Sequence, residues 1–337
     1  MNNETIEFNY KSLSAYQGFL KDRDMLLKSS SGGAARALIE SIIKRKGIVF
    51  GVKYSADLYK AEYCYIDNQN EIDSIIGSKY IYADKRVTYN GKKVPVFKIV
   101  SKFLNQGKIV LFIGLGCDIS SLCTYLNKNN IDRSKLFLVD LICQGPTLPC
   151  VQESYIKRME KKYHAKAIEF SVRYKKLGWT PPYIKLRFEN GKTYDESLYG
   201  SDFGFALMHY SREYCYHCSS KGENHKCDIT LGDFWGLTEK NRGYNRNGVS
   251  ILLVKTEKGL ELLKFIDKSL FECSVADTEL ALRNNPMYYI SRKKYQNQNK
   301  FESNIMNKGL HKAVVEEVGI CKYYFFRCLR IIKKFLK

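Results

Sequence analysis

The chain has 337 residues, 45% of them hydrophobic and 13% aromatic, so it is long enough for a packed core and is not a disordered protein. Its net charge of +20 suits an anionic partner, but no arginine-rich or RNP-like segment accompanies that charge, which argues against nucleic-acid binding. Eleven cysteines, no signal-peptide pattern and no apolar run near the ~18 residues of a membrane span indicate a cytoplasmic protein whose thiols serve metals, clusters or catalysis.

Two serine–glycine turns punctuate the first part of the chain. Residues 1–28 predict a helical lead, and the turn at residues 30–33 (Ser-Ser-Gly-Gly) opens an apolar helical stripe. Strands are predicted at 48–54 and 59–66, before a second turn at residues 77–79 (Gly-Ser-Lys). A turn that opens a helix exposes backbone N–H groups to an anion, yet it is also an ordinary helix cap, so both readings stay open.

The clearest structural signal is a strand, a glycine turn and a helix in succession. The β-rich start of residues 108–126 ends at Gly114-Leu-Gly-Cys117, but the third glycine of a dinucleotide fingerprint is missing from the helix that follows. A second predicted strand, 135–143, also ends in a cysteine, Cys143. Because the carboxyl ends of parallel strands meet at one edge of a sheet, we expect the two thiols to lie together there.

The remaining pattern completes the predicted organisation. Strands at 167–175 and 183–194, the second turning on Asn-Gly, follow a helix and predict an antiparallel hairpin. We therefore expect an α/β protein with a mixed sheet, strand-end cysteine turns, an α+β insertion and a C-terminal helical tail. The helical lead 1–28 precedes a main domain over 29–308. The basic amphipathic helix 309–337 suits either an anionic membrane face or docking on the protein itself.

The cysteine-rich unit CYHCSSKGENHKCDITLGDFWG, residues 215–236, is the strongest indication of a metal site. The C-x-x-C spacing of Cys215 and Cys218 lets two thiolates face one metal or cluster. Adding Cys117 and Cys143 gives the four thiolates of a closed iron–sulfur or structural zinc site.

Other ligand sets remain open at this point. Cys227 and His225 can form a local zinc knuckle with the C-x-x-C pair, and Cys227 or Cys123 can replace one of the four thiolates. A nucleophilic Cys117 is a third reading, although no partner histidine can be identified.

Together these motifs resemble the coenzyme F420 hydrogenase/dehydrogenase beta-subunit family over about residues 28 to 295. The motifs that carry the resemblance are Ser30-Ser31-Gly32-Gly33, Val49-Phe50-Gly51, Gly77-Ser78-Lys79-Tyr80, Gly114-x-x-Cys117, Asp140-Leu141-Ile142-Cys143-x-Gly145, Cys215-x-x-Cys218 and the segment DITLGDFWG, 228–236.

The resemblance implies an iron–sulfur flavoprotein oxidoreductase that moves electrons between hydride carried by FAD and a 4Fe-4S cluster. Carried over by position, the cluster ligands are Cys117, Cys143, Cys215 and Cys218. The flavin contacts implied in the same way are Ser30, Ser31, Gly32, Gly33, Gly77, Ser78, Lys79 and Gly114.

Departures from the family pattern shape the expected partners. The first cysteine is Cys64, so the N-terminal ferredoxin-like domain of many relatives is not expected, and an acidic electron carrier such as a ferredoxin would serve instead. Asp118 and Gln144 replace the Gln and His of the usual turns, which bears on the substrate rather than the cluster.

Short bacterial members of this kind resemble products of polysaccharide gene clusters, which suggests a sugar or nucleotide-sugar substrate. A non-catalytic scaffold and a transferase in polysaccharide assembly are the alternatives.

Overall fold

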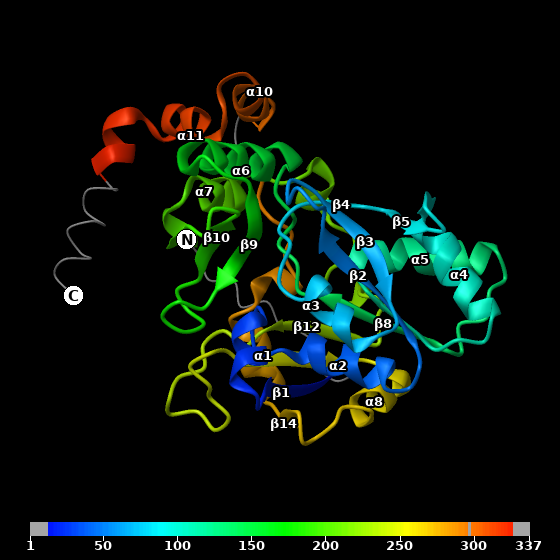
Figure 1. Ribbon diagram of the computed structural model, residues 1–337. Helices are drawn as coiled ribbons and strands as arrows, with labels where there is room; N and C mark the ends of the chain where they lie inside the picture. Colours follow the sequence, from blue (N-terminus) through cyan, green and yellow to red (C-terminus); the bar gives the residue numbers. More distant parts are fainter. Residues whose placement is uncertain (1–12, 296–297, 326–337) are drawn as a thin grey trace.

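The computed structural model describes residues 13–295 and 298–325 and is built on a nine-stranded mixed sheet (Figure 1). In spatial order the strands are β14 (Phe271–Val275), β1 (Ser14–Leu20), β13 (Ser250–Val254), β12 (Ile229–Asp233), β8 (Leu136–Leu141), β7 (Val110–Ile113), β2 (Ile48–Tyr54), β3 (Ala61–Ile66) and β4 (Ala83–Asp84). The expected α/β class with a mixed sheet is confirmed.

The centre of this sheet is parallel and its flanks are mostly antiparallel. Strands β2, β7, β8 and β12 pair in parallel, whereas β12–β13, β13–β1, β1–β14 and β2–β3 are antiparallel pairs. The register of β7 and β8 places Ile113 opposite Val139. The two predicted strands therefore do end at the same edge, as the sequence indicates.

Helices cover both faces of the sheet, which makes three layers. On one face, α2 (Ala34–Ile43) and α8 (Glu257–Lys264) share an apolar core with alternate residues of the central strands. On the other face, α4 (Val96–Asn105) and α5 (Gly116–Lys128) do the same (Figure 1). Central strands buried on both faces explain the continuous apolar runs that end at the two cysteine turns.

A second layered unit packs above the first. The antiparallel sheet of β9 (Ala167–Tyr174), β10 (Tyr183–Phe188) and β11 (Thr193–Ser197) is covered by α6 (Pro149–Tyr163), α7 (Asp202–His209), α10 (Gln298–Lys308) and α11 (Leu310–Val318). The predicted turn lies between β10 and β11, with Gly191 at a φ of +78°. This unit is the expected α+β insertion.

Shorter elements connect these layers. They are α1 (Arg23–Lys28), α3 (Ile72–Ile75), α9 (Thr278–Arg283), the hairpin of β5 (Arg86–Tyr89) and β6 (Lys92–Pro95), and single turns η1 (Gln69–Glu71), η2 (Leu198–Gly200), η3 (Glu213–His217), η4 (Gly222–Asn224) and η5 (Pro286–Tyr288). Turn η3 carries the C-x-x-C pair out of the second unit and toward the sheet edge.

The expected helical lead is wrong for residues 14–20, which form strand β1 between β13 and β14. A Cβ on Gly18 would lie 2.1 Å from the carbonyl oxygen of Glu272, so glycine permits this close pairing. Within 1–28 the structure describes a helix only at α1, and residues 1–12 lie outside the described part. The main domain therefore begins before residue 29.

The C-terminal tail docks on the protein through α11. Leu310, Ala313 and Val314 of α11 are buried against the second unit, and α11 ends before Gly319, which has a φ of +87°. Residues 320–325 are helical again, and residues 326–337 of the expected amphipathic helix lie outside the description.

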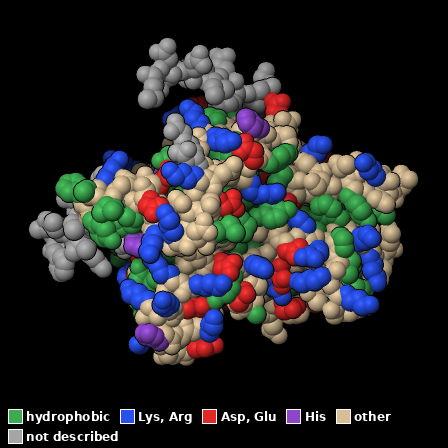
Figure 2. Space-filling model, turned by 90° about the horizontal axis from the view of Figure 1, so that it is seen from above, with side chains coloured by type: hydrophobic (Ala, Val, Ile, Leu, Met, Phe, Trp, Pro, Cys, Tyr) green, Lys and Arg blue, Asp and Glu red, His purple; other side chains and the backbone are tan. Residues whose placement is uncertain are grey.

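The surface charge is dispersed rather than gathered. On the face in Figure 2, Lys and Arg side chains are spread widely, with acidic side chains between them. Within the described residues, every helix is too short or too polar to span a bilayer.

The packing of α10 gives a test of how firmly the second unit is held. Phe301 is fully buried and stacks on Tyr210 with ring centroids 3.9 Å apart, whereas Met306 on the same helix is exposed. We expect Phe301→Ala to lower the free energy of unfolding by about 3–5 kcal/mol, because a large aromatic leaves a cavity. Met306→Ala should change it by less than about 0.5 kcal/mol. Urea unfolding measures both, and equal effects would contradict the packing.

Candidate metal centre

Four cysteines from three segments line one cavity at the carboxyl edge of the sheet. Cys117 lies at the start of α5 after β7, Cys143 follows β8, and Cys215 and Cys218 belong to η3 and the residue after it. The cavity has a volume of about 40 Å³. The structure thus brings together the four thiols selected from the sequence, although whether they bind a cluster stays a prediction.

Glycine at position 145 shapes the turn after β8. Its φ is +98°, and its N–H donates to the sulfur of Cys143 across 3.2 Å. A Cβ there would lie 2.4 Å from the hydroxyl of Ser211 and 3.1 Å from the Cβ of Cys215. Gly145 therefore lets the β8 turn approach the C-x-x-C segment closely.

The environment of the cavity disfavours deprotonation of Cys117 and Cys143. Burial raises the pKa of Cys143 to about 11, and burial together with the neighbouring Asp118 carboxylate raises the pKa of Cys117 to about 12. Lys221 donates to the carbonyl of Cys143, and the guanidinium of Arg292 is buried nearby. In the metal-free protein these two thiols hold their protons at neutral pH, so a metal must displace them.

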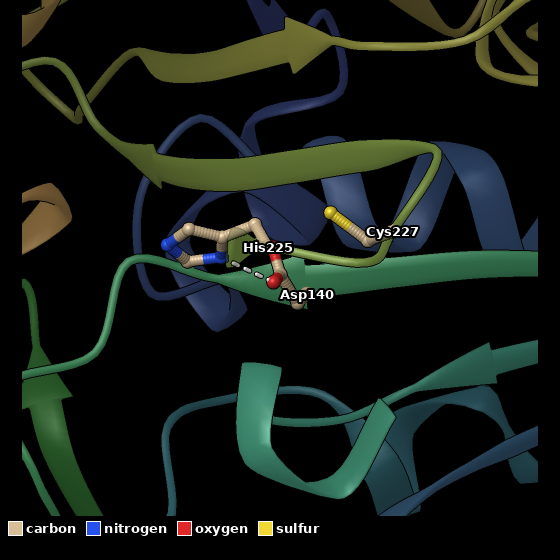
Figure 3. Close-up of side chains that lie close together, drawn as sticks. All are labelled: Asp140, His225 and Cys227. Atoms are coloured by element: carbon tan, nitrogen blue, oxygen red, sulfur yellow. Dashed lines mark hydrogen bonds and ion pairs between the residues drawn. The ribbon is translucent and has the colours of Figure 1, made fainter. Parts of the chain in front are cut away.

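A buried acid–base pair forms part of the cavity wall. His225 lines the cavity, and its Nδ1 lies 2.5 Å from Oδ2 of Asp140, a fully buried residue of β8. The imidazole also stacks on the ring of Tyr288, 4.8 Å between centroids at 4°. Figure 3 shows the pair beside Cys227, whose sulfur lies 3.2 Å from the hydroxyl of Thr230.

The proposed local zinc knuckle is not assembled. Cys227 shares a cluster of donor atoms, all within 4.8 Å, with Asp140 and His225, and it does not line the cysteine cavity. Among the described residues this is the one group of three or more His, Cys, Asp or Glu donors at that spacing. Cys123, on α5, packs in the apolar core. Neither Cys123 nor Cys227 lines the cysteine cavity.

Most of the residues that pack around the cysteine cavity could not be identified from the sequence. Asp140 and His225 are separated by 85 residues, and the sequence offers His225 only as a knuckle ligand. Lys221 and Arg292 carry no signal beyond the overall positive charge. A cysteine turn indicates where a ligand lies but not which distant residues pack behind it.

The two serine–glycine turns lie side by side. The hydroxyl of Ser78 donates to that of Ser30 across 2.8 Å, and Gly33 precedes α2 with a φ of +88°. Ser31 donates to the carbonyl of Val249. The fold thus brings the two turns together, although whether they contact a flavin stays a prediction.

Three other flavin candidates are placed differently. Lys79 donates to the carbonyl of Ile76 across 2.7 Å, and burial lowers its pKa to about 7. Gly77 is exposed, and Gly114 lies at the end of β7, where a Cβ would contact the Tyr63 hydroxyl. None of the eight flavin candidates lines the cysteine cavity or the larger cavity of about 310 Å³ beside β3.

Two buried cations from the β9 segment hold the first turn. Arg173 donates to the carbonyl of Ser30 across 3.2 Å, and Lys175 donates to that of Ser31 across 2.6 Å. Arg173 also pairs with Asp233 at 3.1 Å and lies over the ring of Trp235. The serine–glycine turn and the Gly-Asp-Phe-Trp-Gly turn therefore meet at one guanidinium, which the sequence does not reveal.

Comparisons with known proteins bear on the family and the fold. Residues 107–278 match the sequence model of a family described as the C-terminal part of the coenzyme F420 hydrogenase/dehydrogenase beta subunit. No curated protein matches the chain in sequence. A chain of the F420-reducing NiFe hydrogenase complex from Methanosarcina barkeri is similar in structure, with a TM-score of 0.54 and 16% identity, over 90% of this chain and 96% of that one. At that identity the likeness shows the fold alone.

A control substitution distinguishes the effect of the close contacts at Gly145 from the effect of its positive φ. Gly145 and Gly191 both have positive φ, but a Cβ on Gly191 would meet nothing within 4 Å. We expect Gly191→Ala to cost about 1 kcal/mol of unfolding free energy from strain. Gly145→Ala should cost about 1–3 kcal/mol more, because it also overpacks the cavity wall. Urea unfolding of the metal-free variants measures the difference, and equal losses would refute the contact.

The buried ammonium of Lys175 gives a pH test. Burial and the neighbouring Arg173 lower its pKa from 10.5 to about 7. Between these values the unfolded chain holds a proton that the folded chain lacks, so the free energy of unfolding should rise with pH from about 7 to 10. Lys175→Met should remove that part of the rise, whereas Lys176→Met, at the exposed neighbouring position, should not. The free energy of unfolding, measured at a series of pH values, tests this prediction. If it rises equally steeply with pH in wild type and in Lys175→Met, Lys175 is not the group responsible.

Proposed function

Because the chain belongs to the coenzyme F420 hydrogenase/dehydrogenase beta-subunit family, we propose that it is an iron–sulfur oxidoreductase. The ligands of its 4Fe-4S cluster are Cys117, Cys143, Cys215 and Cys218. One observation carries this proposal: four thiols from three separate segments line a single cavity at a sheet edge. A bound 4Fe-4S cluster supplies one-electron transfer.

The spacing of the thiols favours a cluster over a single zinc ion. Four sulfurs around one tetrahedral zinc, at about 2.3 Å each, lie only about 3.8 Å from one another. Within the described residues, no three of the four cavity sulfurs lie within 4.8 Å of one another. A larger group with several metal ions fits such separated donors better than one ion does.

The charges around the cavity fit an anionic group. Lys221 lines the cavity, and the buried guanidinium of Arg292 interacts electrostatically with Cys143 and Cys215. Four cysteine thiolates make a bound cluster negative overall, and buried cations lower the cost of placing that charge away from water. Lys221 and Arg292 hold their positions by donating to backbone carbonyls.

We also propose that FAD binds at Ser30, Ser31, Gly32, Gly33 and Ser78, close to the contacts of Arg173 with Ser30 and of Lys175 with Ser31. The supporting observation is the convergence of the two turns, the N-terminus of α2 and the buried guanidinium of Arg173, which suits a pyrophosphate. FAD supplies the exchange between hydride and single electrons. Gly77, Lys79 and Gly114 remain flavin contacts only as expectations.

We further propose that an electron carrier docks at the mouth of the cysteine cavity. Leu141 and Tyr214 line the cavity and are exposed, and Lys221 adds positive charge. An acidic electron carrier such as a ferredoxin would pair with such a surface. A sugar or nucleotide-sugar remains the proposed substrate.

The test of this function is a metal analysis with a matched control. Protein purified without oxygen should contain close to four irons with matching acid-labile sulfide, and a broad visible absorption that bleaches with dithionite. Cys215→Ser should lose most of the iron and that absorption, because it removes one cavity thiol. Cys273→Ser, at an exposed cysteine outside the cavity, should retain both. Iron-free wild-type protein that resists reconstitution would refute the proposal.

A further inference from the structure

His225 is fixed in the wall of the cysteine cavity by two contacts. Its Nδ1 pairs with Asp140 at 2.5 Å, and its ring stacks on Tyr288. Both neighbours are buried, and the His225 side chain is itself 3% exposed. The imidazole therefore cannot turn freely, and the direction of its second nitrogen is set by the fold.

The second nitrogen, Nε2, is the polar atom of His225 that remains available to a group in the cavity. His225 lines the cavity, and Asp140 occupies its Nδ1 edge. Figure 3 shows Nε2 pointing away from both Asp140 and Cys227. Nε2 is buried and has no hydrogen-bond partner among the described residues.

The pairing is compatible with Nε2 acting as a donor. Asp140 and Nδ1 of His225 share one proton, and a second proton on Nε2 leaves the buried pair without net charge. A buried N–H without an acceptor is destabilising, so an acceptor in the cavity would remove that cost.

A metal ion held by Asp140, His225 and Cys227 is the competing use of the same side chains. Oxygen and nitrogen ligands of one tetrahedral ion, each at about 2.0 Å, stand about 3.3 Å apart. Oδ2 of Asp140 and Nδ1 of His225 are 2.5 Å apart, which suits a shared proton. The trio is therefore a hydrogen-bonded group, and the free nitrogen points elsewhere.

Position 116 preserves this arrangement. A Cβ on Gly116 would lie 3.2 Å from Oδ2 of Asp140, 3.4 Å from Nδ1 of His225 and 3.1 Å from Cβ of Ser220. Gly116 immediately precedes Cys117 and lines the same cavity. The absence of a side chain there lets the acid–base pair approach the turn that carries the thiol.

We propose that His225 donates a hydrogen bond from Nε2 to a sulfur of the iron–sulfur cluster and thereby raises the cluster's reduction potential. This inference rests on the proposed function. Hydrogen bonds to cluster and cysteine sulfurs stabilise the more negative, reduced state. Asp140 acts as a positioning residue, because it fixes the ring and its proton without touching the cluster.

The closing experiment measures the reduction potential of the reconstituted cluster by optical or magnetic titration. His225→Phe keeps the ring but removes the donor, so the potential should fall while iron content stays near that of wild type. His225→Arg restores both a charge for Asp140 and an N–H donor, and it should bring the potential back toward wild type. His217→Phe, at an exposed histidine outside the cavity, should leave the potential unchanged.

A second readout needs no variant. Histidine labelled with ¹⁵N should give a weak nitrogen coupling in pulsed magnetic resonance of the reduced wild-type cluster, because His225 is the histidine that lines the cavity. No coupling, or equal potentials in wild type and His225→Phe, would overturn the inference while leaving the cluster proposal intact. A wild-type protein without iron would overturn both.

Discussion

The parallel pairing of β7 and β8 is the constraint on which the site depends. Ile113 is opposite Val139, and each is followed at the same distance along the chain by a cysteine, Cys117 or Cys143. Because the two strands run in the same direction with this register, both thiols lie at the same edge of the sheet. A register shift of one residue would reverse which side chains of β7 face α2 and which face α5, so the two apolar cores fix the register and with it the cavity.

The second half of the cavity comes from a different layer. Cys215 follows α7, and the N–H of Cys218 is held by the hydroxyl of Ser291 at 3.0 Å. Packing of the upper unit, including the stack of Phe301 on Tyr210, therefore bears on how the C-x-x-C segment meets the sheet edge. The four thiols lie where the two units join, and neither unit contains a complete set.

The sequence predicts features that depend on neighbouring residues, such as single strands and turns, and the cysteines that follow strand ends. Apolar runs predict β7 and β8, and the Asn-Gly pair predicts the hairpin of the insertion, because such signals act within a few residues. Strand β1 escapes prediction because its alternation is interrupted by Gly18, which packs against β14 far along the chain. Arg173 and the Asp140–His225 pair could not be predicted, since each depends on which distant segments become neighbours.

The chemistry of the thiols decides between a metal site and a nucleophile. A catalytic cysteine needs a lowered pKa, usually from a nearby cation or an imidazole base. Cys117 instead has Asp118 as its neighbour, and burial together with this carboxylate raises its pKa. Lys85 is drawn into an ion pair with that carboxylate. A raised pKa disfavours the thiolate that nucleophilic attack needs, so the environment of Cys117 favours ligation over nucleophilic attack.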